Sequence, residues 1–290
     1  MAAHRVALLT DSTCDLPAEM IARYDIRVIP AYVIWDGEQL RDGVDITPSE
    51  FYRRLSSAAS LPTTAAPTPD DFLRAFEEAR NDGAEELVVI TVSRAMSGTY
   101  QAAVNAAGQC DLPVHVIDAR GSTMTIGWQV IAATRAREAG GDAAAMIAAA
   151  NAARARMVQI VCPATLDYLY KGGRIGGAAH LVGSVLNIMP LVRIDHEAGI
   201  VQPGRLVRTV KRARKALLED FIAELDAAPG QPVHIAVLHT NEPEAHRELL
   251  ARVQEQFPQA EIVTNLTGPV LGLHTGPGAL ALAGYVEDGG

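Results

Sequence analysis

Glu86-Leu-Val-Val-Ile-Thr-Val92 is followed directly by the polar stretch Ser93-Arg-Ala-Met-Ser97-Gly-Thr-Tyr100. The first run is mostly β-branched and aliphatic, as expected of a strand that helices cover on both faces. Ser97-Gly98-Thr99 then opens the next helical stretch. A buried strand, a polar loop and a helix in this order form the repeating unit of an α/β fold.

The same unit recurs through the first half of the chain. Further strands are predicted at Arg5–Thr10, Val28–Trp35 and Val114–Asp118. Helix starts are predicted at Asp15-Leu16-Pro17, Thr47-Pro48-Ser49-Glu50 and Thr68-Pro69-Asp70-Asp71, where a capping residue precedes proline. The alanine-rich stretch Asp142–Arg156 is predicted as one helix, because alanine is the best helix former. We therefore predict an N-terminal α/β domain, a doubly wound parallel sheet, over residues 1–157.

The second half has a different pattern and is predicted as a C-terminal α+β domain over residues 158–290. A strand at Val158–Cys162 leads to the glycine-rich run Lys171–Gly177, and Pro190–Ile194 with Ile200–Val207 form a predicted hairpin. The last segment, Pro269–Tyr285, is predicted as a glycine-rich turn followed by a terminal helix. Between these segments, helices are expected from Thr209 and Glu242, with strands at Val233–His239 and Glu261–Leu266.

Composition excludes several classes of function. The chain has 290 residues and a formal net charge of −9, which argues against general nucleic-acid binding and against docking on an anionic membrane. No apolar stretch is long enough for a membrane span, so no integral membrane association is expected. Three dispersed cysteines fit a reducing compartment, and we predict a cytoplasmic protein.

The sequence lacks the common motifs of nucleotide-binding, catalytic and zinc sites. There is no glycine-rich dinucleotide motif, phosphate-binding loop, nucleophile elbow or His-Glu-x-x-His, and the eight histidines lack a zinc-like spacing. No catalytic residue, metal site or cofactor is therefore predicted.

Short polar clusters do follow the predicted strands. They are Thr10-Asp-Ser-Thr13, Ser93–Tyr100 and Asp118–Ser122, and loops of this kind share the ligand-binding edge of an open parallel sheet. The backbone N–H groups at Ser97-Gly98-Thr99 favour a small anion. Ser97 as a simple helix cap and Asp11 as a turn residue remain alternative interpretations.

Six blocks together resemble the DegV family of bacterial fatty-acid-binding proteins over essentially the whole chain. The blocks are Thr10-Asp-Ser-Thr-Cys-Asp-Leu-Pro17, Leu61–Thr68, Ser97-Gly-Thr-Tyr-Gln-Ala-Ala103, Thr165–Ile175 with its Lys-Gly-Gly-Arg-Ile, Val207-Arg-Thr209, and Gly268–Gly278 with its His-Thr-Gly-Pro-Gly. The resemblance implies a carrier without catalytic activity of its own, which encloses one long-chain fatty acid between two domains. Some members of the family deliver that acid to a fatty-acid kinase, which is therefore a predicted partner.

The resemblance also implies which residues contact the carboxylate. They are Thr64, Ser97, His274 and Arg174, with Asp11, Ser12, Gly98 and Thr99 in the supporting loops. The chain departs from the family at Thr64-Ala-Ala-Pro-Thr68, where Thr-Ser-Gln-Pro-Ser is common, so polar neighbours of Thr64 are lost.

Two other classes of function remain open from the residues. An enzyme, hydrolase or kinase-like, acting on a small anionic metabolite would use the same edge, with Asp11 and His274 as its nameable acid and base. A DNA-binding regulator would use the basic cluster at Arg205–Lys215, which the net charge disfavours.

Overall fold

The computed structural model describes residues 5–181 and 189–287. Its N-terminal sheet consists of β2 (Ile26–Ile29), β1 (Val6–Asp11), β6 (Glu86–Thr91) and β7 (Val114–Asp118), in that order. All neighbouring pairs are parallel, so the predicted parallel sheet is confirmed. The helices of this half are α1 (Ala18–Arg23), α2 (Pro48–Leu55), α3 (Pro69–Asn81), α4 (Thr99–Ala107), α5 (Met124–Glu138) and α6 (Ala143–Ala155).

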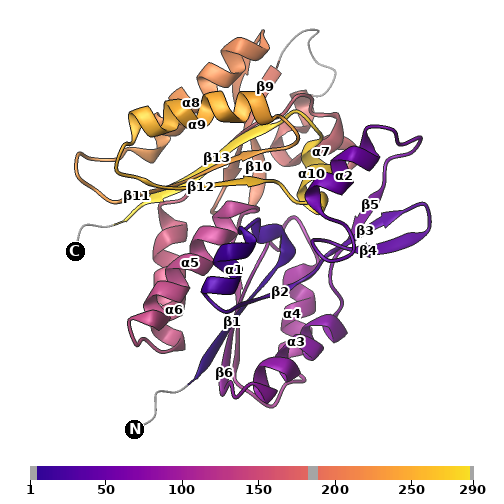
Figure 1. The fold of residues 1–290 in the computed structure, drawn as a ribbon, viewed down its shortest axis with the longest axis vertical. Coiled ribbons are helices and arrows are strands. Elements are labelled where there is room, and N and C mark those ends of the chain that lie inside the picture. Colours follow the sequence, from indigo (N-terminus) through magenta and orange to yellow (C-terminus); the bar gives the residue numbers. More distant parts are fainter. Residues whose placement is uncertain (1–4, 182–188, 288–290) are drawn as a thin grey trace.

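Helices cover both faces of the parallel sheet, with α3 and α4 on one side and α5 and α6 on the other (Figure 1). Successive strand residues point to opposite faces. Leu9 and Val89 accordingly pack with Phe72 of α3, whereas Leu8 and Val88 share a core with Trp128 of α5. This alternation explains the continuous apolar runs in the sequence.

The predicted helix starts at Thr47 and Thr68 are confirmed. The Thr47 hydroxyl accepts a hydrogen bond from the Glu50 N–H at 3.3 Å. Thr68 and Asp71 form a complete capping box, each side chain accepting from the other's backbone N–H. The helix predicted after Pro17 is also present, but Asp15 does not cap it.

The prediction of one strand over Val28–Trp35 is wrong. The segment forms β2 and β3 (Tyr32–Trp35), which belong to different sheets. Pro30 lies at the break, and it has no backbone N–H to donate to a neighbouring strand. β3 pairs instead with β4 (Glu38–Arg41) and β5 (Thr63–Ala65) in a small antiparallel sheet.

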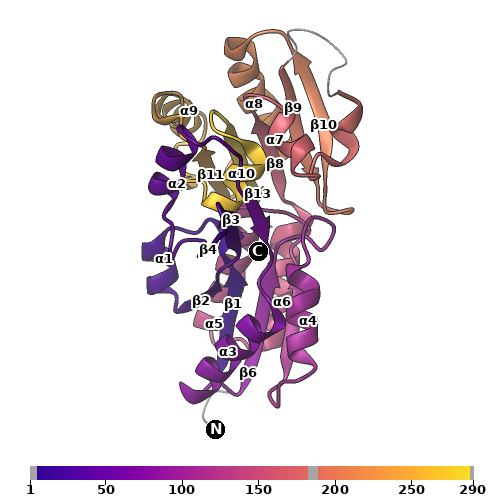
Figure 2. The same cartoon turned by 90° about the vertical axis from the view of Figure 1, so that its right-hand side faces the viewer.

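The C-terminal sheet has six strands in the order β10-β9-β8-β13-β11-β12. Their bounds are β8 (Val158–Cys162), β9 (Met189–Asp195), β10 (Ile200–Val207), β11 (Val233–His239), β12 (Glu261–Leu266) and β13 (Leu280–Val286). The accompanying helices are α7 (Asp167–Lys171), α8 (Val210–Leu225), α9 (Pro243–Gln256) and α10 (Pro269–Thr275). α8 and α9 cover one face, and the other face turns toward the N-terminal half (Figures 1 and 2). The division into domains at residue 157 stays a prediction.

The prediction of a terminal helix is wrong. Only Pro269–Thr275 is helical, and the chain then forms β13 in the middle of the sheet, antiparallel to both β8 and β11. The run Ala279-Leu-Ala-Leu-Ala283 favours a helix locally, but pairing on both sides overrides that weak preference. Gly284 is required by the close approach, because a Cβ there would lie 2.3 Å from the His234 carbonyl oxygen.

Among residues 5–181 and 189–287, no helix has the length and apolar composition of a membrane span. The small sheet packs with α2 and α10, so residues near position 50 share a core with Val270 and Leu273. This contact brings α10 to the N-terminal half of the chain.

Candidate ligand-binding site

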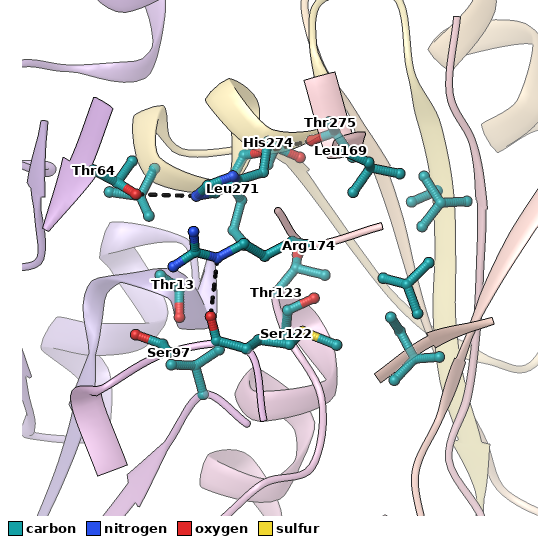
Figure 3. A pocket seen from close by; sticks show the side chains of 18 of the residues that line it. Thr13, Thr64, Ser97, Ser122, Thr123, Leu169, Arg174, Leu271, His274 and Thr275 are labelled. Atoms are coloured by element: carbon teal, nitrogen blue, oxygen red, sulfur yellow. Dashed lines mark hydrogen bonds between the residues drawn. The ribbon is translucent and has the colours of Figure 1, made fainter. Parts of the chain in front are cut away.

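A cavity of about 270 Å³ lies where the loops after β1 and β6, the six-stranded sheet and α10 meet. Its polar lining gathers at one side (Figure 3) and includes Thr13, Thr64, Ser97, Ser122, Thr123, Arg174, His274 and Thr275. Its aliphatic lining includes Val92, Val161, Leu169, Val192, Ile194, Val201, Leu238 and Ala281. The structure therefore brings the four predicted contact residues Thr64, Ser97, Arg174 and His274 to one cavity.

Thr64 and His274 are in direct contact, although 210 positions separate them in the sequence. The Thr64 Oγ1 and His274 Nε2 atoms are 3.0 Å apart (Figure 3). Burial, with a smaller contribution from Arg174, lowers the pKa of His274 to about 4. The imidazole is therefore neutral at pH 7 and carries one donor and one acceptor nitrogen.

Arg174 is held by backbone carbonyls of two segments. Its Nε donates to the Met96 carbonyl at 3.1 Å, and its Nη1 donates to the Gly172 carbonyl at 2.7 Å (Figure 3 shows the first bond). A Cβ at Gly172 would lie 2.4 Å from His274 Nδ1, so glycine there allows the imidazole to approach. The glycine-rich run after α7 thus positions both a guanidinium and an imidazole.

Ser97 lies just before α4. Gly98 is the N-cap residue, and the Ser97 Oγ accepts from the Thr99 N–H at 3.3 Å and lies 2.8 Å from the Thr99 Oγ1. Ser97, Gly98 and Thr99 all line the cavity. Ser97 is therefore not the cap residue that the alternative interpretation expected, but it accepts a hydrogen bond from the first residue of α4 and lines the cavity.

Asp11 and Ser12 lie behind the lining of the cavity rather than in it. The Asp11 carboxylate accepts from the N–H groups of Val92 at 2.8 Å and Thr13 at 3.0 Å, which joins the ends of β1 and β6. Burial raises the pKa of Asp11. The Ser12 hydroxyl donates to Asp42 Oδ2 at 3.0 Å and accepts from the Ala31 N–H at 3.1 Å.

Asp15 and Asp42 form a buried pair next to the start of α10. The Asp15 Oδ1 accepts from the Gly268 N–H at 2.8 Å, and the Asn265 Nδ2 donates to the Asp15 carbonyl at 2.8 Å. Burial raises the pKa of each carboxyl to about 7, and Asp15 further raises that of Asp42. Asp15, predicted to begin a helix, instead connects the loop after β1 to the helix that carries His274.

Sequence reasoning missed several cavity residues. Thr123 has a positive φ of 53°, and no local pattern predicted that conformation. Gln159 carried a signal that could have been used, because it is the one polar residue in the strand Val158-Gln-Ile-Val-Cys162. Thr267 lies two residues before α10, and Thr275 is the last residue of α10. The bounds of this helix were predicted incorrectly.

The described residues give little support to a metal site or to a nucleic-acid-binding surface. Within residues 5–181 and 189–287, no group of three or more His, Cys, Asp or Glu side chains could hold a metal ion. In the basic cluster, Arg205 pairs with Glu219 at 3.0 Å and Arg214 with Glu242 at 3.1 Å. Much of this cluster's charge is therefore compensated within the chain.

Three comparisons with known proteins agree with this architecture. A family model described as an uncharacterised protein of the DegV family matches residues 5–287. A DegV domain-containing protein of Streptomyces coelicolor is 36% identical over 278 residues, covering 96% of this chain and 97% of its own length.

Two solved structures are similar over nearly their whole length. A DegV family protein from Thermus thermophilus, described as fatty-acid binding, has a TM-score of 0.90 and 32% identity, covering 98% of this chain and 100% of the other. A stearic-acid-binding protein from Eubacterium ventriosum has a TM-score of 0.87 and 26% identity, covering 97% and 98%. The sequence match over residues 5–287 shows that this chain belongs to the DegV family.

Proposed function

We propose that this protein binds one long-chain fatty acid and acts as a carrier without catalytic activity of its own. The observation that carries the proposal is the cavity itself, which joins a cluster of hydroxyl, imidazole and guanidinium groups to an aliphatic wall. A ligand with one anionic group and a long apolar chain matches both parts. The fatty-acid binding described for the Thermus thermophilus and Eubacterium ventriosum relatives supports the same ligand class.

The carboxylate would contact Thr64, Ser97, Arg174 and His274. If the neutral His274 donates its Nε2–H to the Thr64 oxygen, the Thr64 hydroxyl hydrogen is free to donate to the carboxylate. The Ser97 hydroxyl and the Arg174 guanidinium supply further donors, and hydrogen bonds to a charged group are the stronger kind. Thr64 keeps this role even though Ala65 and Ala66 provide no polar neighbours.

The aliphatic wall would supply most of the affinity. Burying about 14 methylenes contributes roughly 11 kcal/mol before the costs of binding, at ~0.8 kcal/mol each. A hydrogen bond to a charged group contributes only about 1.5–3 kcal/mol. The tail therefore sets affinity, and the polar cluster sets which end of the ligand lies there.

The same proposal includes a fatty-acid kinase as the protein partner and the cytoplasm as the location. A second cavity of about 350 Å³ shares Thr64, Arg174 and His274 with the first and is also lined by Lys171. A phosphoryl donor approaching the carboxylate would meet two cationic side chains there, which is the charge that phosphoryl transfer requires. The test is ATP-dependent acyl-phosphate formation with the kinase from the same organism, and no acyl phosphate with the loaded protein would contradict the partnership.

An enzyme acting on a small anionic metabolite is less well supported. Its nameable acid and base were Asp11 and His274. Asp11 is fully buried and bonded to Val92 and Thr13 behind the lining, whereas His274 faces the cavity. The pair that acid–base catalysis needs is not assembled.

Native mass spectrometry of the purified protein, followed by lipid extraction, tests fatty-acid binding. We expect a bound mass that extraction identifies as a long-chain fatty acid. Repeated recovery of ligand-free protein that also fails to bind added palmitate would contradict the proposal.

A further inference from the structure

One polar side chain interrupts the aliphatic wall that β8, β9, β10 and β13 present to the cavity. Gln159 on β8 lines the cavity together with Val161, while β9, β10 and β13 contribute Val192, Ile194, Val201, Leu280 and Ala281. Among the described residues of these four strands that line the cavity, Gln159 is therefore the exception.

The amide of Gln159 is buried without full hydrogen bonding. The side chain is 3% exposed, and its Oε1 has no hydrogen-bond partner among the described residues. A buried polar group without a partner is costly, and where it faces a cavity a polar group of a ligand can supply the missing hydrogen bond. An aliphatic residue would suit a plain hydrocarbon tail better at this position.

A second buried glutamine also has an Oε1 without a hydrogen-bond partner among the described residues, so it is the position facing the cavity that distinguishes Gln159. Gln129 of α5 is also fully buried, but its Nε2 donates to the carbonyls of Ala119 and Thr125 at 3.0 and 2.8 Å. Gln129 is also outside the lining of the cavity. The Gln129 amide joins α5 to the loop after β7, whereas the Gln159 amide faces the cavity.

Strand register places Gln159 far from the carboxylate end. Gln159 is paired with Ala283 of β13, whereas Leu280, the first residue of that strand, is paired with Cys162 and lies five residues after the end of α10, which carries His274. The three steps from Leu280 to Ala283 correspond to about 10 Å along the strand. Gln159 thus lies along the part of the cavity that the distal half of a fatty-acid tail would occupy.

We propose that Gln159 forms a polar subsite for the tail, and that the preferred ligand is a long-chain fatty acid bearing a hydroxyl group in its distal half. This inference rests on the proposed fatty-acid binding. A hydroxyl both donates and accepts, so it satisfies the amide whichever way the amide is turned. A site built to hydrogen-bond a substrate hydroxyl discriminates strongly against the analogue that lacks it.

The test compares stearic acid with 10-hydroxystearic and 12-hydroxystearic acids on delipidated protein, by calorimetry or by competition in native mass spectrometry. Of the two hydroxy acids, we expect the one that binds more tightly to have a Kd about tenfold lower than that of stearic acid. Gln159→Met, which keeps the length of the side chain and removes its amide, should bring that ratio close to one. Ile194→Met is the matched control, because it changes a neighbouring aliphatic position on β9 and should leave the ratio unchanged.

The outcomes separate this inference from the proposed function. If no fatty acid binds, fatty-acid binding itself is wrong. If stearic acid binds and wild type shows no hydroxyl preference, or Gln159→Met keeps that preference, only the polar subsite is wrong. Thermal unfolding of the ligand-free variant checks folding, and its Tm should not fall, because the substitution removes a buried amide oxygen that lacks a partner.

Discussion

The two ends of the cavity are built in different ways. At the polar end, Thr64, Ser97, Arg174 and His274 come from β5, the loop before α4, the glycine-rich run after α7, and α10. The aliphatic wall comes mainly from neighbouring strands of one sheet, β8, β9, β10 and β13. The wall therefore depends on strand register, whereas the polar end depends on four separate segments meeting at one place.

What lies behind the lining also differs. The polar end is backed by the buried carboxyls of Asp15 and Asp42, whose pKa values are raised to about 7 by burial. Asp15 accepts a hydrogen bond from the first residue before α10, and α10 carries His274. Behind the wall, Ile160 and Leu191 on the opposite faces of β8 and β9 share an apolar core with Phe221 of α8. Changes at the wall should thus alter tail binding, and changes behind the polar end should alter stability and its dependence on pH.

The largest effect is expected at the wall. Ala281→Phe places a ring in the cavity, and excluding about four methylenes of the tail costs about 3 kcal/mol, roughly a hundredfold in Kd for palmitate. Titration calorimetry with palmitate and decanoate measures the difference. Decanoate should be much less affected, since its shorter tail leaves room. Equal losses for both acids would show that the wall does not hold the tail.

The next effect concerns the polar end. Ser97→Ala removes one hydroxyl donor and leaves the backbone N–H groups of α4, so we expect a loss of about 2 kcal/mol for a fatty acid. A fatty alcohol of the same length carries no charge and should lose almost nothing. Binding of palmitate and hexadecanol to wild type and variant checks this. If acid and alcohol lose the same affinity, Ser97 acts only in supporting the start of α4.

Asp42→Asn tests the buried carboxyls behind the polar end. Because burial raises the pKa of Asp42 from 3.8 to about 7, folding favours its protonated form. The stabilisation that comes from the protonated Asp42 carboxyl is fully present below pH 4 and is lost as pH rises through 7. The asparagine variant, whose amide oxygen still accepts from Ser12, should be more stable than wild type by about 1–2 kcal/mol at pH 8, with little advantage at pH 5.

Urea unfolding of both proteins at pH 5 and pH 8 measures this difference. Asp45→Asn is the matched control, because hydrogen bonds from Arg41 lower the pKa of the exposed Asp45 to about 2. The stability that the Asp45 carboxylate contributes is lost only as pH falls from about 4 through 2. The free energy of unfolding of Asp45→Asn should therefore differ from that of wild type by the same amount at pH 5 and pH 8. If the free energy of unfolding of Asp42→Asn also differs from that of wild type by the same amount at pH 5 and pH 8, the expected pH dependence is wrong.

The smallest effect is expected for Thr64→Val. The substitution removes the hydroxyl that contacts His274, but the imidazole N–H can then donate to the carboxylate itself, so the loss should be about 1 kcal/mol. Palmitate affinity of Thr64→Val, compared with that of the nearby Thr63→Val, measures it. Thr63 is outside the main cavity lining, and an equal loss at both positions would mean that Thr64 makes no specific contact.

Local patterns in the sequence predicted much of the N-terminal half. Apolar runs identified β1, β6 and β7, and capping residues identified the starts of α2 and α3, because each signal depends only on neighbours in the chain. The polar clusters after the strands were also expected at one edge, and Ser97 to Thr99 lie there. As contacts of a carboxylate, Thr64, Arg174 and His274 were named only through the family resemblance, since no local pattern connects residues so far apart.

Only the tertiary structure decided the rest. The run Ala279–Ala283 has helical propensity, yet β8 and β11 on either side make it a central strand. The same pairing places Gln159 opposite Ala283, among the aliphatic residues that line the cavity. Asp15 likewise contacts Gly268, 253 positions away. The physical reason is common to all three cases: the deciding hydrogen bonds or pairings join distant segments, and local propensities of a few tenths to 1 kcal/mol per residue are too small to oppose them.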